Sequence, residues 1–366
     1  MNRYLTRSAN NASMHNEIER AWVEIDLGAL QQNGATIARL ARVPLIPMVK
    51  ADAYGLGVIP VVRTLESLDP WGYGVATADE GVELRAAGIS RPIIVFTPSL
   101  DAEHESIAEH GLTPALSSES QIRAWSARGL PWQLSIDTGM SRAGVPWREV
   151  ASLSTVLSDH KPQGVFTHFH SAQLQDGSLE EQLARFDEAV AAIPDRPDFI
   201  HAEASAAIVR CAPSKWSVVR PGIFLYGVGS GAEPEPAPVV HLRATIVDIR
   251  TLEAGDTVSY DATFVAGTRM RIATVAAGYA DGYPRALSNR SSGLLNGETV
   301  RITGRVTMDM TMFDVTGADC KVGDVITLIG TGGSRTITIQ QIADWADMSP
   351  YEVLTGLRNR IKRVYK

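Results

Sequence analysis

The feature that most constrains the fold is an alternation of short apolar runs with amphipathic stretches through the first two thirds of the chain. The stretches between the runs, such as residues 78–87 and 179–192, carry apolar residues at helical spacing. Eight strands that alternate with helices predict a closed parallel (β/α)8 barrel, an α/β fold, over residues 21–239. The eight runs, most of them rich in Val, Ile, Leu and Phe, lie at residues 44–50, 72–77, 92–97, 112–116, 131–137, 163–168, 198–203 and 217–225.

A doubly wound open sheet is the alternative arrangement of the same elements. It is less favoured because no G-x-G-x-x-G motif follows the first run. In a barrel, the catalytic groups come from the carboxyl ends of the strands. Lys50 stands at such an end, since it closes the apolar run of residues 44–49.

The pattern changes near residue 230. Residues 229–238 are rich in Gly, Pro and Glu, which predicts a linker or surface loop. One helix is expected at residues 339–347. The remaining short runs are punctuated by Gly and Asp turns and predict an all-β C-terminal domain over residues 240–366. These runs lie at residues 240–251, 256–260, 270–277, 298–303, 311–315 and 324–329.

Composition and charge exclude several classes of function. The chain has 366 residues, a formal net charge of -7 and no block of basic residues, so neither nucleic acid nor an anionic membrane is an expected partner. No apolar run approaches the ~18 residues of a membrane span. Residues 1–20 are polar and predict a loose extension and a cytoplasmic protein. Cys211 and Cys320 form no C-x-x-C motif, so no metal site is expected.

Lys50 is the first candidate for chemistry. A lysine at the end of a buried strand is rarely buried without a partner, and the glycines at 55 and 57 indicate a tight turn directly after it. A desolvated lysine has a lowered pKa and becomes a nucleophilic amine, which suits a Schiff base. The alternative is an edge lysine whose ammonium reaches into water.

Eight short motifs occur in order along both predicted domains. They are Lys50-Ala51-x-Ala53-Tyr54-Gly55, Ile136-Asp137-Thr138-Gly139-Met140-x-Arg142, Thr167-His168-Phe169, Arg220-Pro221-Gly222-Ile223-x-x-Tyr226-Gly227, Val258-Ser259-Tyr260, Gly278-Tyr279-Ala280-Asp281-Gly282-Tyr283, Gly304-Arg305-x-x-Met308-Asp309 and Tyr351-Glu352. Together they resemble the motifs of the alanine racemases. These enzymes depend on pyridoxal 5'-phosphate (PLP) and join a barrel to a C-terminal β domain. The resemblance implies an isomerase that interconverts L- and D-alanine.

The resemblance also implies two catalytic bases. Racemisation removes the α-proton from one face of a planar carbanion and returns a proton on the other, while the cofactor acts as the electron sink. Lys50 would hold PLP and serve as one base, and Tyr260 would be the other. A tyrosine with an ordinary pKa near ~10 is a poor base at neutral pH, so Tyr260 needs cationic neighbours. The alternative for Tyr260 is a core aromatic residue in a strand.

His168 and Arg220 would form a chain from Tyr260 to the ring nitrogen of the cofactor. Arginine stays cationic and can only donate hydrogen bonds, so Arg220 would disfavour protonation of the ring. We expect a weaker electron sink and fewer side reactions such as transamination. The alternative is a surface arginine before a proline turn.

The cofactor phosphate would lie against backbone N–H groups at a strand end. By resemblance, Gly222 and Ile223 supply these amides, Ser205 a hydroxyl, and Tyr54 and Tyr351 phenolic OH groups. Glycine at 222 is reasonable because the anion must approach the main chain closely. The alternative for Ser205 is a helix N-cap.

The substrate would be a small amino acid. By resemblance, Arg142 faces its carboxylate, the Met308 amide is a second donor, and Tyr279 narrows the entrance. For Met308, core packing is the alternative. In this family, the counterparts of Tyr260 and Met308 serve the active site of the other subunit, which implies a head-to-tail homodimer.

The sequence departs from the family around the pocket. Ser135 stands where a lysine, often carboxylated, supports the arginine that corresponds to Arg142. We hypothesise that a bound anion such as chloride, or Glu203, holds Arg142 instead. Further departures leave the reaction type in place but make a broader or serine-directed specificity an alternative. They are Asp52, Leu56, the residues after Phe169, Ala204, Asp261 and Thr307.

Two other functions compete with a racemase for alanine. A non-catalytic PLP-binding barrel would lack the β domain that carries Tyr260. A fold-related decarboxylase would need a glycine-rich phosphate loop and a catalytic cysteine near the C-terminus, and Cys320 lies in a turn instead.

Overall fold

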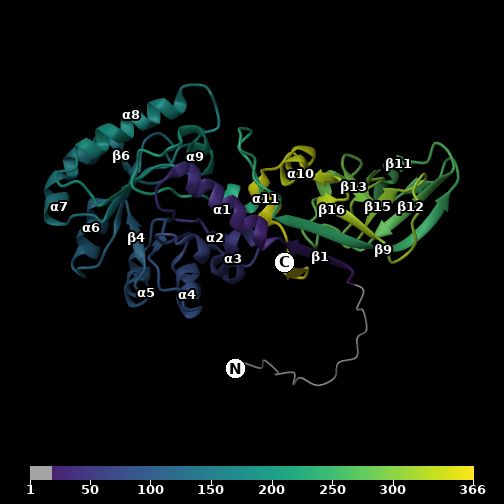
Figure 1. Ribbon diagram of the computed structural model, residues 1–366, viewed down its shortest axis with the longest axis horizontal. Helices are drawn as coiled ribbons and strands as arrows, with labels where there is room; N and C mark the ends of the chain where they lie inside the picture. Colours follow the sequence, from purple (N-terminus) through teal and green to yellow (C-terminus); the bar gives the residue numbers. More distant parts are fainter. Residues whose placement is uncertain (1–18) are drawn as a thin grey trace, which may run out of the picture.

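The computed structural model describes residues 19–366, so the predicted polar extension over residues 1–20 lies almost wholly outside the described residues. The molecule is elongated, with a barrel at one end and a β-sheet domain at the other (Figure 1). Helices α10 (Ile339–Ala346) and α11 (Pro350–Thr355) lie between them, and α11 packs on the barrel helix α2 (Lys50–Gly55).

The N-terminal part is the predicted (β/α)8 barrel. Three isolated parallel bridges, Leu45 to Val219, Met48 to Gly74 and Ala204 to Arg220, close the ring where the first and last strands were expected. The first strand is reduced to bridge residues because Pro44 and Pro47 lack a backbone N–H. Six parallel strands complete the barrel: β2 (Tyr73–Val75), β3 (Ile93–Val95), β4 (Thr113–Leu116), β5 (Gln133–Asp137), β7 (Gly164–Phe166) and β8 (Phe199–His201).

The helices around the barrel begin at side-chain caps that the sequence supplies. Asp26 accepts a hydrogen bond from the Ala29 N–H at 2.8 Å, and Thr77 with Glu80 forms a capping box at the start of α4. The two helices predicted at 78–87 and 179–192 are confirmed to within one residue. The barrel helices are α1 (Leu27–Ala41), α3 (Val58–Leu65), α4 (Ala78–Ala86), α5 (His104–Glu109), α6 (Glu119–Ser126), α7 (Ser154–Asp159), α8 (Ser178–Ala191) and α9 (Ser205–Cys211).

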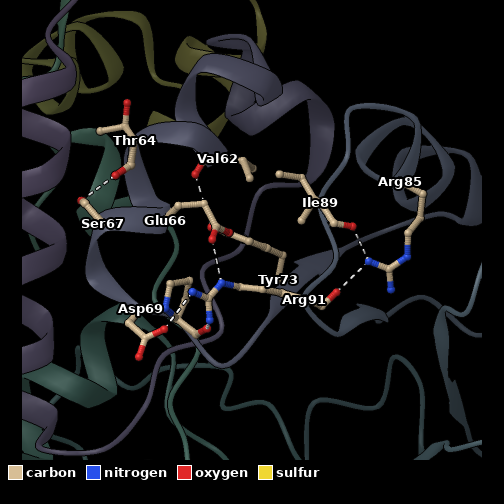
Figure 2. Close-up of polar contacts among 10 residues, drawn as sticks. Val62, Thr64, Glu66, Ser67, Asp69, Tyr73, Arg85, Ile89 and Arg91 are labelled. Carbon is tan, nitrogen blue, oxygen red and sulfur yellow. Dashed lines mark hydrogen bonds and ion pairs between the residues drawn. The ribbon is translucent and has the colours of Figure 1, made fainter.

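A polar network fixes the segment between α3 and β3 on the outside of the barrel (Figure 2). The Arg91 guanidinium donates to Glu66 and to Asp69, each at 2.8 Å, and the Tyr73 hydroxyl donates to Glu66 at 2.8 Å. Arg85 donates to the Arg91 carbonyl at 2.7 Å. The guanidinium of Arg91 therefore links the end of α3 to the loop that leads into β3.

The C-terminal domain is built on one long central strand, β9 (Val240–Leu252), so the predicted all-β domain is confirmed. The predicted helix at 339–347 is observed as α10. The other strands are β10 (Thr257–Val258), β11 (Phe264–Val265), β12 (Met270–Val275), β13 (Ser292–Leu295), β14 (Glu298–Arg301), β15 (Thr311–Asp314), β16 (Val325–Gly332), β17 (Arg335–Ile337) and β18 (Lys362–Tyr365).

The first described strand, β1 (Ala21–Ile25), lies in the C-terminal sheet. It pairs antiparallel with β9, where Val23 opposes Leu242, and parallel with β18, where Val23 opposes Arg363. The chain thus contributes to the C-terminal sheet before it enters the barrel. The domain limits predicted from sequence, at 1–20, 21–239 and 240–366, remain a prediction.

Among residues 19–366, no helix combines the length and apolar character that crossing a bilayer requires. Within the same residues, no group of three or more His, Cys, Asp or Glu side chains could hold a metal ion.

Candidate active site

Lys50 stands at the carboxyl end of the first barrel strand and is followed by a left-handed turn. The four residues after it have φ angles between 52° and 58°, a conformation that costs L-residues about 1–2 kcal/mol each. Neighbouring carboxylates hold the turn in place. Glu80 accepts from the Ala51 N–H at 2.7 Å, and Asp52 accepts from the Val58 N–H at 2.7 Å.

The environment of Lys50 favours a neutral amine. Burial lowers the pKa of Lys50, the nearby Arg142 guanidinium lowers it further, and Glu80 acts in the opposite direction. An amine with a lowered pKa is a better nucleophile and a better base near neutral pH. The expectation from sequence, a desolvated lysine at a strand end, therefore agrees with the structure.

Arg220 is buried, with 3% of its surface exposed, so the surface alternative for this residue is wrong. Its guanidinium donates to the His201 Nδ1 atom at 2.7 Å and to the Thr167 carbonyl at 2.6 Å. Burial lowers the pKa of Arg220 to about 9, while Glu203 acts to raise it. The guanidinium is held rigidly and remains cationic at neutral pH.

His168 lies close to three positively charged side chains of the barrel. Its pKa is lowered to about 3 by burial and then by Arg220, Arg142 and Lys50, in that order. The imidazole is therefore neutral at physiological pH and can accept one hydrogen bond while it donates another. The structure thus brings together four of the residues predicted from sequence.

The predicted phosphate-binding residues form a second cluster on the same barrel. The Ser205 hydroxyl accepts hydrogen bonds from the Gly222 N–H at 2.9 Å and the Phe224 N–H at 3.3 Å. Ser205 is the first residue of α9, and Ala204 occupies the cap position, so the N-cap alternative for Ser205 is wrong. Ile223 begins a short 3-10 helix, where the first N–H groups have no acceptor within the helix.

Tyrosine rings and a glycine shape the space at this cluster. The Tyr54 ring stacks on Tyr226 with centroids 4.5 Å apart and lies 5.9 Å from the ring of Tyr351. A Cβ atom at Gly222 would meet the Tyr54 hydroxyl at 2.6 Å. Backbone amides, a serine hydroxyl and phenols around a residue without a side chain are donors that fit a phosphate group.

Arg142 lies at the mouth of the barrel, exposed to solvent, on a loop held by hydrogen bonds. The Asp137 carboxylate accepts from the Gly139 and Ser141 N–H groups at 2.9 and 3.1 Å. Within the part of the chain that the structure describes, no acidic side chain forms an ion pair with Arg142. Ser135 is buried on β5.

The hypothesis that Glu203 holds Arg142 is not supported. Glu203 is buried. A hydrogen bond with Ser214 and the positive charges of Arg220 and Lys215 act to lower the pKa of its carboxylate. Burial raises its pKa, and one of its oxygens has no hydrogen-bond partner among the described residues. Arg220 is among the groups that shift the pKa of Glu203, and Arg142 is not.

The predicted site residues of the C-terminal domain are exposed. Tyr260, Tyr279 and Met308 are 70%, 38% and 52% exposed, so the core alternatives for Tyr260 and Met308 are wrong. Tyr260 lies between β10 and β11, and β11 is drawn near the end of the molecule opposite the barrel (Figure 1). The Tyr279 N–H donates to the Thr307 carbonyl at 3.0 Å, which places Tyr279 beside Met308.

Sequence reasoning missed three supporting residues. Glu80 holds the turn after Lys50, His201 fixes Arg220, and the Tyr226 hydroxyl donates to the Met48 carbonyl at 2.8 Å. The capping-box pattern from Thr77 to Glu80 marks Glu80 as a helix residue but does not show that it reaches the turn after Lys50. No local pattern identifies His201.

Comparisons with known proteins cover both parts of the chain. Residues 25–230 match the family described as alanine racemase, N-terminal domain, and residues 239–365 match alanine racemase, C-terminal domain. The chain is 37% identical to the alanine racemase of Halothermothrix orenii, over 96% of this chain and 99% of that protein. It is 35% identical to that of Carboxydothermus hydrogenoformans, over 94% and 99%.

Solved structures agree with these relatives. The alanine racemase of E. faecalis superimposes with a TM-score of 0.88 at 29% identity, covering 96% of this chain and 99% of that one. That of Bartonella henselae, solved with covalently bound pyridoxal phosphate, has a TM-score of 0.88 at 30% identity, covering 95% and 100%. With both domains matched over nearly their whole length, the chain belongs to the alanine racemase family.

Proposed function

We propose that this chain is a PLP-dependent isomerase that interconverts L- and D-alanine with two bases, Lys50 and Tyr260. The observation that carries the proposal is Lys50 itself. It is an amine with a lowered pKa at the carboxyl end of a barrel strand, beside Arg142 and close to the neutral His168. PLP, when bound, supplies the electron sink that makes the α-proton of the substrate acidic.

The side chains of the barrel have distinct roles in this proposal. Lys50 holds the cofactor and exchanges a proton at its Nζ atom with one face of the substrate. Arg220 would hold the ring nitrogen of the cofactor and, because the guanidinium stays cationic, would disfavour protonation of that nitrogen. The neutral imidazole of His168, close to Arg220, would relay polarisation to the phenol of Tyr260, which a second copy of the chain contributes.

The remaining residues bind the cofactor and the substrate. The phenols of Tyr54 and Tyr351 would bind the cofactor phosphate, and the Arg142 guanidinium would pair with the substrate carboxylate. The Met308 N–H is a second donor to that carboxylate, and the Tyr279 ring narrows the entrance. The groups that bind the phosphate through amides and a hydroxyl are Gly222, Ile223 and Ser205.

A head-to-tail homodimer completes each site. Tyr260, Met308 and Tyr279 are exposed, which suits a role opposite the barrel of a second copy. Large exposed apolar side chains gathered on one face are typical of an interface. In this arrangement, each barrel receives its tyrosine base from the partner.

Mixing two inactive variants tests the site and the dimer together. Lys50→Ala and Tyr260→Phe each lose most racemase activity alone. Unfolding and refolding them as an equimolar mixture gives heterodimers in which one site has both mutations and the other has none. Recovery of activity is the expected result. Full activity in either variant alone would disprove its catalytic role, and no recovery on mixing would place both bases in one chain.

The alternatives are not favoured. The relatives compared above act on alanine by name, at 35–37% identity over nearly the full chain, which supports alanine rather than a broad or serine-directed specificity. Chiral chromatography of a panel of L-amino acids, incubated with the protein, measures this preference directly. A non-catalytic PLP carrier has no use for the exposed Tyr260.

The setting of the reaction is part of the same proposal. Cys211 and Cys320 are unpaired thiols, which suits the reducing cytoplasm. The two enantiomers have equal free energy, so the equilibrium constant of the reaction is one. Metabolism supplies L-alanine, and the net reaction therefore runs towards D-alanine biosynthesis.

A further inference from the structure

The geometry points to Asp261 as a positioning residue for Tyr260, acting through its ion pair with Arg305. This inference rests on the proposed function, in which the Tyr260 phenol is a base. The Arg305 Nε atom donates to the Asp261 carboxylate at 2.9 Å, directly beside Tyr260 in the chain. Asp261 is also a departure from the family motif, which has glycine after the tyrosine.

The backbone around Tyr260 is held in a conformation that its residues disfavour. Ser259, Asp261 and Ala262 have φ angles of 67°, 62° and 48°, in the left-handed region that suits glycine. Three such residues around one side chain persist only where surrounding contacts determine them. The loop therefore depends on the groups that bind it from outside.

Those groups come mainly from one segment, residues 304–305. The Ser259 hydroxyl donates to the Arg305 carbonyl at 2.8 Å, so Arg305 binds the residues on both sides of Tyr260. Gly304 allows the close approach, because a Cβ atom there would meet the Val258 carbonyl at 2.6 Å. Within one chain, packing cannot replace these contacts, because Tyr260 is 70% exposed.

The same segment leads to the proposed carboxylate donor. Arg305 precedes Met308 by three residues, and the Met308 carbonyl accepts from the Ala280 N–H at 3.0 Å next to Tyr279. The ion pair thus keeps the base and the substrate-binding amide in a fixed relationship on one face. Loss of the pair displaces the phenol relative to the α-proton, and a displacement of about 1 Å can cost about 100-fold in rate.

The experiment separates the ion pair from the backbone conformation. Asp261→Asn keeps a residue that tolerates positive φ but removes the charge, and Asp261→Gly relieves the strain and removes the charge. Glu253→Gln is the matched control, because the Arg269–Glu253 pair at 3.3 Å is an exposed ion pair in the same domain. The readouts are kcat and KM for each enantiomer and the exchange of its α-proton with D2O.

We expect kcat to fall about tenfold in both Asp261 variants while KM changes less than about twofold. The proton on the Lys50 face should still exchange with solvent, so the ratio of exchange to racemisation should rise for one enantiomer only. Replacing Arg305 with Lys should retain part of the rate, because a cation remains. Glu253→Gln should change neither kcat nor the ratio of exchange to racemisation.

Wild-type kcat and exchange ratios in Asp261→Gly would overturn the inference, as would an equal change in the ratio of exchange to racemisation for both enantiomers. Different results would contradict the proposed function. If the wild-type protein does not racemise alanine, or if Tyr260→Phe has no effect, the assignment of Tyr260 itself is wrong. If Tyr260→Phe is impaired and Asp261→Gly is not, only the positioning role is rejected.

Discussion

The Tyr54 hydroxyl lies so close to Gly222 that a methyl group on that glycine would come within 2.6 Å of it. Gly222→Ala therefore displaces the phenol or the strand end, and both belong to the proposed phosphate site. We expect the dissociation constant for PLP to rise at least about tenfold, or about 1.4 kcal/mol. Titration of the apoprotein with PLP, followed by absorbance, measures this.

Gly317→Ala is the matched control for that substitution. Nothing lies within 4 Å of a Cβ atom at Gly317, and its φ angle is not in the left-handed region. It should bind PLP as the wild type does. Equal PLP affinity in Gly222→Ala would show that the phosphate lies elsewhere.

Lys50→Ala should abolish both the activity and the near-visible absorbance of lysine-bound PLP. The reason is chemical, because Lys50 stands at the strand end of the site and burial lowers the pKa of its amine. Lys161→Ala removes an exposed lysine that pairs with Asp198, and it should leave both signals unchanged. Retained absorbance in Lys50→Ala would identify another lysine as the attachment point.

Tyr260→Phe should slow turnover unequally in the two directions. The two enantiomers have equal free energy, so kcat/KM must fall equally for both, and the asymmetry appears in kcat and in proton exchange. The enantiomer whose α-proton faces Lys50 should still exchange that proton with D2O without racemising. Small and equal changes in kcat for both enantiomers would remove Tyr260 from the mechanism.

Much of the barrel follows from sequence because each βα unit carries its own local signal. The runs near β2 to β8 are short and apolar, and the helices between them have caps and periodic faces. The first strand is harder to recognise, since Pro44 and Pro47 limit it to bridges. The pairing of strand β1 is also hard to predict, because a strand pattern in the sequence does not reveal that its partners are β9 and β18.

The residues of the candidate site also differ in how well the sequence predicts them. Residues inside short motifs, such as Lys50 and Arg220, could be predicted because the motif carries both the chemistry and the position. Glu80 and His201 could not, since their roles depend on contacts across loops and barrel strands. The Asp261–Arg305 pair joins residues 44 positions apart, a separation that no local pattern encodes.

The acid stability of the fold should depend on Glu24, which joins the first strand to the last residues of the chain. Its carboxylate pairs with Arg243 on β9 and with Lys366, each at 3.0 Å. Burial acts to raise the pKa of Glu24, but the hydrogen bonds from Trp22, Lys366 and Arg243 outweigh it and lower the pKa from 4.5 to about 2. The ionised form is therefore the one that the folded state prefers.

The sign of the pH effect follows from that preference. The contribution of Glu24 is complete above pH 4.5 and is lost as the pH falls towards 2, because the unfolded chain binds the proton first. The separation between the two pKa values corresponds to at most about 3 kcal/mol. Glu24→Gln should lower the free energy of unfolding by about 1–3 kcal/mol at pH 7, and the difference from wild type should shrink below pH 4.5.

Urea unfolding of both proteins at pH 7, 5, 4 and 3 measures this difference. Glu298→Gln is the control, because the Arg335–Glu298 pair joins strands of the same sheet at 3.0 Å but is largely exposed. An exposed pair contributes less than about 1 kcal/mol. A Glu24→Gln difference that stays constant from pH 7 to pH 3 would show that packing, rather than the carboxylate charge, holds β1 between β9 and β18.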